Sequence, residues 1–240
     1  MTSMTTPADT KPRRVLLATP SYDGRIDVWY ANSLVGTLAL AAGAGVEVSP
    51  VWMSYDALIQ RSRNDLIALA VAKDFDDIVW IDSDMAWEPQ WFMELLDSPR
   101  DVVGGTTRKK TDHEEVYPVK TRSLALEDDG TIAVESIGTG FVRTSRRAFL
   151  AAWDASRPYR DRGRAGERRM VFEVVVGPEG DLVSEDVAFM GKMRAAGFQP
   201  HLMPHMTCLH VGPKVFEGDF MRYRERVIES WGGDRDPARS

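Results

Sequence analysis

Short apolar runs alternate with longer amphipathic segments in the first half of the chain, and this alternation constrains the fold more than any other feature. The runs Arg14–Pro20, Val46–Met53 and Asp76–Ile81 have the length and composition of strands. Segments 28–44 and 55–71 between them carry apolar residues every three to four positions, which is the helical period. Strands separated by helices predict a mostly parallel sheet covered on both faces, with ligand-binding groups at the carboxyl ends of the strands.

The second half has a less regular pattern. It predicts one more strand at Asp101–Gly105. It also predicts three short β-like pieces, at 117–120, 123–126 and 131–137, with a turn at Asp128-Asp-Gly130 between the last two. Helices are expected at 88–96, 145–153, 184–196 and 216–231. The short pieces predict a smaller mixed β region beside the main sheet.

Length and composition fit one compact α/β domain. The chain has 240 residues, of which 43% are hydrophobic and 28% charged, so we expect a single Rossmann-like domain over residues 13–232. Residues 1–12 are expected to be a disordered leader and residues 233–240 a flexible tail. The net charge of -6 excludes a general electrostatic attraction to nucleic acid or to anionic membrane.

The compartment is predicted from what the sequence lacks. Cys208 is the single cysteine, so no internal disulfide can form, and the polar segment Met1–Thr10 lacks the apolar core of a signal peptide. The apolar stretch Leu34–Val48 is interrupted by glycines and is too short to span a bilayer. The expectation is a cytoplasmic protein without a membrane anchor.

Two carboxylates stand at the end of the third strand, in Asp82-Ser83-Asp84. Oxygen ligands in this spacing can hold a hard divalent cation, Mn²⁺ or Mg²⁺. Such a cation bridges the phosphates of a nucleoside diphosphate and stabilises the charge that develops when the diphosphate leaves. The alternative reading of the same residues is a solvated acidic loop.

Seven short motifs occur in a fixed order along the chain: Ala18-Thr-Pro20, Arg61-Ser-Arg-Asn64, Ile81-Asp-Ser-Asp-Met85, Val103-Gly-Gly105, Gly138-Thr-Gly-Phe141, Ser184-Glu-Asp186 and His210. In this order the sequence resembles GT-A glycosyltransferases, in particular the family-2-like bacterial and phage-borne members, over residues 14–210. The resemblance implies a GT-A domain that transfers a sugar from a nucleotide-diphosphate sugar, of UDP type, to a hydroxyl acceptor.

The resemblance also implies roles for individual residues. It places the donor beside Thr19, Pro20, Asp23, Arg63, Asn64, Asp82, Ser83, Gly138 and Gly140. The guanidinium of Arg63 suits a phosphate or a base edge, although an arginine on a helix can equally pair with nearby acids. The glycines allow a close approach of backbone to sugar, or simply a tight turn.

The metal and the chemistry are assigned in the same way. The resemblance implies that Asp84 and His210 ligate the metal, with Asp82 sharing it or lying nearer the ribose. Asp186, next to Glu185, is implied as the general base that takes the proton of the acceptor hydroxyl in an inverting reaction. The alternative is that both acids favour the start of a helix, with Ser184 as its N-cap.

Segment 156–169 contains six arginines on an otherwise acidic protein. They are expected either to clamp donor phosphates or an anionic acceptor, or to form a solvated mobile loop. The acceptor is expected to be a glycan, a small molecule or, as for some phage enzymes, a hydroxylated modified base in DNA. Alternatives of another class are a nucleotidyltransferase, for which Thr19–Gly24 is a poor match, and a non-catalytic nucleotide-sugar binding protein.

Overall fold

The computed structural model describes residues 11–112 and 114–231. The expected leader, 1–12, lies outside the described residues except for Lys11 and Pro12, and the expected tail, 233–240, lies outside them altogether. No helix in the described part of the chain is both long and apolar enough to cross a bilayer.

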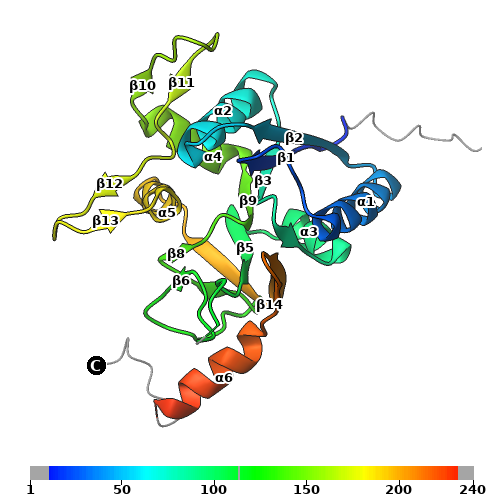
Figure 1. Cartoon of the computed structure of the whole chain (residues 1–240), viewed down its shortest axis with the longest axis vertical. Coiled ribbons are helices and arrows are strands. Elements are labelled where there is room, and N and C mark those ends of the chain that lie inside the picture. Colours follow the sequence, from blue (N-terminus) through cyan, green and yellow to red (C-terminus); the bar gives the residue numbers. More distant parts are fainter. Residues whose placement is uncertain (1–10, 113, 232–240) are drawn as a thin grey trace, which may run out of the picture.

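A mixed sheet forms the centre of the domain (Figure 1). Its strands run in the order β15-β14-β5-β9-β3-β1-β2, and the short strands β4 and β7 also pair with β14. Their bounds are β1 Arg14–Ser21, β2 Glu47–Ser54, β3 Asp77–Ile81, β4 Met85–Ala86, β5 Val102–Thr107, β7 Ile132–Ala133, β9 Phe141–Ser145, β14 Pro200–Val211 and β15 Val215–Phe216. Strands β2, β1, β3, β5 and β14 share one direction and β9 opposes it. The predicted α/β domain with a mostly parallel sheet is confirmed.

Helices cover both faces of this sheet, as the alternation of side chains along β1 requires. Val15 and Leu17 pack with α1 (Val28–Gly43) and α3 (Pro89–Asp97) in one apolar cluster. Leu16 and Ala18 belong to the other cluster, which includes residues of α2, α4 and α5. These three helices span Ile59–Ala72, Arg146–Ala155 and Glu185–Ala195. The last helix, α6 (Phe220–Ser230), packs beside β14, as Figure 1 shows.

The smaller β region consists of three two-stranded pieces: β6 (Val119–Lys120) with β8 (Ser136–Ile137), β10 (Pro158–Tyr159) with β11 (Arg168–Arg169), and β12 (Val175–Val176) with β13 (Leu182–Val183). The strand predicted at 123–126 is wrong. There the backbone N–H groups of Ser123 and Ala125 donate to the hydroxyls of Thr121 and Ser123. Such local side-chain acceptors compete with strand pairing.

The sequence pattern did not predict two strands of the main sheet, β9 and β14. β9 is only five residues long and pairs with β3 and β5, which precede it by many residues. β14 is twelve residues long but contains Pro200 and Pro204. Its pairing with β5 shifts register between Leu202 and Thr207, so Pro204 lies in the irregular part, where the missing N–H is tolerated.

Candidate functional site

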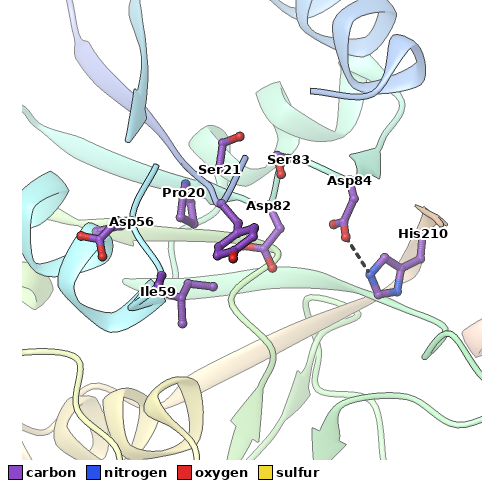
Figure 2. Close-up of a pocket in the computed structure, with 11 residues that line it drawn as sticks. Pro20, Ser21, Asp56, Ile59, Asp82, Ser83, Asp84 and His210 are labelled. Carbon is purple, nitrogen blue, oxygen red and sulfur yellow. Dashed lines mark ion pairs between the residues drawn. The ribbon is translucent and has the colours of Figure 1, made fainter. Parts of the chain in front are cut away.

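Two adjoining cavities lie at the edge of the sheet where β1, β3 and β5 end and β9 begins. The first, here called the carboxylate pocket, has a volume of about 220 Å³ and is lined by residues that include Pro20, Ser21, Asp56, Asp82, Ser83 and Asp84 (Figure 2). The second, the glycine pocket, has a volume of about 230 Å³ and is lined by residues that include Gly105, Gly138, Gly140, Glu185 and Asp186. Ile59, Asp82 and His210 line both. The two cavities therefore form one continuous candidate site.

Asp84 and His210 lie side by side at one end of the carboxylate pocket (Figure 2). His210 Nε2 lies 3.6 Å from Asp84 Oδ2. His210 Nδ1 lies 3.0 Å from the carbonyl oxygen of Arg108, which can only accept, so Nδ1 carries a hydrogen and Nε2 is the ring nitrogen directed at Asp84. Burial raises the pKa of Asp84, but hydrogen bonds from His210 and Lys110 outweigh it and the net pKa is lowered. Asp84 thus presents an anionic oxygen beside an imidazole nitrogen.

These two side chains fit a divalent cation as a partial ligand set. One carboxylate oxygen and one imidazole nitrogen suit Mn²⁺, leaving positions for phosphate oxygens and water. Within residues 11–112 and 114–231 no group of three or more His, Cys, Asp and Glu side chains is arranged to hold a metal. Asp82, the third expected ligand, instead accepts a hydrogen bond from Arg63.

Arg63 connects the Asp82 motif to helix α5. Its Nη2 donates to Asp82 Oδ1 at 2.8 Å and its Nη1 donates to Glu185 Oε1 at 2.6 Å. The side chain is 3% exposed. Since both terminal nitrogens are engaged by carboxylates, Arg63 and Glu185 hold each other in place in the glycine pocket.

Asp186, unlike Glu185, forms no ion pair within the described part of the chain. It lies in the first turn of α5, half-buried, and lines the glycine pocket. The Ser184 hydroxyl donates to Asp186 Oδ1, and the Val187 N–H donates to the same oxygen at 2.8 Å. Ser184 occupies the N-cap position but makes no side-chain capping bond, because its hydroxyl is directed to Asp186. A β-carbon at Gly138 would lie 3.8 Å from Asp186 Oδ2, so the glycine leaves room beside this carboxylate.

Most of the residues expected at the donor site do meet here. Pro20, Asp82 and Ser83 line the carboxylate pocket, and Gly138 and Gly140 line the glycine pocket. A β-carbon at Gly140 would lie 3.3 Å from Asp82 Oδ2, closer than ordinary packing allows. The glycine therefore permits the start of β9 to approach the Asp82 motif.

Three expected donor residues have their side chains elsewhere. The Thr19 hydroxyl is buried and bonds to Tyr30 Oη at 2.6 Å in the core. Asn64 is buried and holds Phe172 by both its amide groups, through Nδ2 to the carbonyl oxygen at 2.9 Å and through Oδ1 from the N–H at 2.8 Å. Asp23 accepts from the Arg25 N–H in an exposed loop. Core packing accounts for the first two residues and a local turn for the third.

Sequence reasoning missed two charged residues of the site. Asp56 follows β2 and lines the carboxylate pocket, where the bidentate guanidinium of Arg61 holds the pKa of Asp56 below its ordinary value. The rule that polar residues after each strand matter, applied to β2, would have found it. Lys110 donates to Asp84 Oδ2 at 2.6 Å. No local sequence pattern indicates that Lys110 belongs to the site, because its partner Asp84 precedes it by 26 residues.

The arginine-rich segment is largely neutralised by acids. Arg164 and Arg168 form ion pairs with Asp65, whose side chain is fully buried, and Arg164 also pairs with Asp56. Arg157 pairs with Glu173 and Arg169 with Glu167. The segment forms the β10–β11 hairpin, tied to α2 through the two pairs with Asp65, so the basic surface is smaller than six arginines suggest.

These observations define a mixed α/β domain whose charged and glycine residues gather at the carboxyl ends of parallel strands. No known protein family matches the sequence, and no curated protein matches it. Among solved structures the chain is similar to the protein A197 from STIV, with a TM-score of 0.53 and 17% identity over 85% of this chain and 93% of that chain. It has a weaker likeness to a glycosyltransferase involved in the glycosylation of the major capsid of PBCV-1, with a TM-score of 0.32 and 12% identity over 60% of this chain and 66% of that chain. The first likeness shows a shared fold, and the second carries no conclusion.

Proposed function

We propose that this protein is a glycosyltransferase that takes a nucleotide-diphosphate sugar, of UDP type, as donor and a hydroxyl group as acceptor. The observation that carries the proposal is the arrangement of Asp84 with His210 on one side of Asp82 and of Asp186 on the other, around two joined cavities. This is the placement that the ordered motifs of the sequence imply for a donor site beside an acceptor site.

The two cavities suit the two parts of such a donor. The nucleoside diphosphate would lie in the carboxylate pocket, with its phosphates toward Asp84 and His210. The sugar would extend past Asp82 into the glycine pocket, where Gly138 and Gly140 leave the backbone open to close approach. Ligands of open α/β sheets bind at this edge, outside the carboxyl ends of the strands.

Asp84 and His210 would hold a Mn²⁺ or Mg²⁺ ion. The ion supplies Lewis-acid stabilisation of the charge on the departing diphosphate. The hydrogen bond from His210 Nδ1 to the Arg108 carbonyl keeps Nε2 directed at Asp84. The Asp84 carboxylate is kept ionised by its neighbours, as its lowered pKa indicates.

Asp186 is the group best placed to act as the general base. As the acceptor oxygen bonds to the anomeric carbon, its proton passes to Asp186 and the bond between that carbon and the diphosphate oxygen breaks, with the electron pair leaving on the diphosphate. Glu185 is engaged by Arg63 and so serves to position the start of α5. A glycan or small molecule is the proposed acceptor. A modified base in DNA gains less support, because four arginines of the basic segment are ion-paired.

Calorimetry with UDP-, GDP-, CDP- and TDP-sugars, with and without Mn²⁺, tests the proposal. We expect one nucleotide to bind in a Mn²⁺-dependent way, and Asp84→Ala and His210→Ala to lose that dependence. Asp97→Ala, which removes an exposed carboxylate at the end of α3, is the matched control and should bind like the wild type. Asp186→Asn should lower sugar transfer while leaving donor affinity within about 2-fold, because an amide cannot take the proton. Absence of nucleotide binding across the panel would refute the assignment.

A further inference from the structure

Two buried threonines of the glycine pocket have hydroxyl groups without a partner. Thr106 is 4% exposed and Thr139 is 2% exposed, and both line this pocket. Among the residues that the structure describes, neither Oγ1 atom has a hydrogen-bonding partner. Thr107, which lines the same pocket, differs, because its hydroxyl donates to the carbonyl oxygen of Cys208 at 3.2 Å. Most buried polar groups in folded proteins are paired, so these two hydroxyls, which share the pocket with the unpartnered Nε of Arg63, need an explanation.

The strand arrangement brings these two threonines to the same pocket. Thr106 lies at the carboxyl end of β5, and Thr139 directly precedes the neighbouring strand β9. A β-carbon at Gly104 would lie 2.5 Å from the carbonyl oxygen of Phe141, and one at Gly105 would lie 2.5 Å from that of Met206. The two glycines therefore allow β5 to lie close to both neighbours, which fixes Thr106 beside the start of β9.

The charges of the pocket select the kind of ligand. Asp82, Glu185 and Asp186 outnumber the cationic side chains Arg63 and Lys109 that also line it. Arg63 is moreover engaged by two of these carboxylates. An anionic group is therefore disfavoured, whereas a neutral threonine hydroxyl, with one donor and two acceptor positions, matches the hydroxyl groups of a sugar.

We propose that Thr106 and Thr139 determine sugar specificity: their hydroxyls hydrogen-bond to hydroxyl groups of a neutral hexose, the part of the donor that is transferred. This inference rests on the proposed function and adds the sugar class and the residues that recognise it. Both oxygen atoms are covered by neighbouring atoms, so binding requires rotation about χ1 between staggered positions. The cost of keeping two unpaired hydroxyls in the free protein is recovered when the sugar supplies their partners.

Thr106→Val and Thr139→Val test this, since valine keeps the shape and removes the hydroxyl. Each variant, free of ligand, should melt no lower than the wild type, because the lost hydroxyl has no protein partner. Thr37→Val is the matched control: the buried Thr37 hydroxyl accepts from Trp87 Nε1 at 2.9 Å, so its loss should lower the melting temperature. Melting of Thr106→Val or Thr139→Val as low as that of Thr37→Val would overturn the inference.

Binding supplies the second readout, with the glucose conjugates of UDP, GDP, CDP and TDP compared with the corresponding free diphosphates in Mn²⁺. Each pocket variant should weaken binding of the nucleotide sugar about 2- to 10-fold and leave binding of the diphosphate unchanged. The Thr37→Val control should bind both as the wild type does. If the variants bind sugar conjugate and diphosphate in the wild-type ratio, the inference fails and the proposed function stands. If the wild type binds neither, the proposed function fails and the inference with it.

Discussion

Replacing Arg63 by methionine should destabilise the domain and break the link between the two halves of the candidate site, the Asp82 motif and the start of α5. The guanidinium joins Asp82, after β3, to Glu185, at the start of α5. Methionine fills much of the same buried volume beside Phe172 but cannot donate a hydrogen bond. The substitution therefore leaves two carboxylates near each other without their shared cation.

The magnitude follows from the two contacts and their exposure. Hydrogen bonds to charged groups contribute about 1.5–3 kcal/mol each. The Asp82 and Glu185 side chains are 32% and 15% exposed, so both can regain some hydration when Arg63 is removed. A net loss of about 2–3 kcal/mol is expected after that discount. For a domain of this length the melting temperature should fall by about 4–12 °C.

Chemical unfolding followed by circular dichroism measures this loss. Arg147→Met is the control, because Arg147 is 72% exposed and its pair with Asp101 is screened by solvent, so its loss should change the unfolding free energy little. The Arg63 variant should also lose sugar transfer, since Glu185 and the start of α5 lose their anchor. Equal unfolding free energies for the two variants would refute the view that Arg63 links the halves of the site.

Two further predictions concern single side chains. Lys110→Met should tighten Mn²⁺ binding by up to about 5-fold in calorimetry, because the Lys110 ammonium competes for Asp84 Oδ2; weaker binding would contradict this competition. Burial and the neighbouring Arg100 lower the pKa of His201, so the folded state takes up its proton less readily than the unfolded state, whose histidine titrates at about pH 6.5. The contribution of His201 to stability is therefore present above about pH 6.5 and is lost as the pH falls toward its lowered pKa in the folded state. His201→Gln should lose less unfolding free energy than the wild type between pH 7 and about pH 5. Parallel pH profiles of the two proteins would contradict this prediction.

The sequence pattern predicted the parts of the fold that depend on local periodicity. The strands and helices of the first half lie within a few residues of their predicted bounds, for example α1 at Val28–Gly43 and β3 at Asp77–Ile81. Gly197 ends α5 with a φ of +88°, which glycine adopts without strain. The polar residues after β3 lie at the candidate site because carboxyl ends of parallel strands share one edge of the sheet.

Residue partners could not be predicted in the same way. Arg63 and Glu185 are 122 positions apart, and Asn64 and Phe172 are 108 apart, so no local spacing reveals either contact. The arginine-rich segment appeared as a basic patch because its acidic partners, Asp56 and Asp65, lie on a different element. Long-range pairing decides which charges remain available.

The sequence by itself determined the α/β class, the mostly parallel arrangement of the strands and the edge of the sheet where the Asp82 motif lies. These follow from the apolar periodicity and from the shared direction of the strands. The tertiary structure alone decided that β9 inserts between β3 and β5, that Thr19 and Asn64 bond within the core, and that Arg63 engages Glu185 rather than Asp186. The reason is that burial and hydrogen bonding depend on neighbours in space, which the chain acquires only when its distant segments pack together.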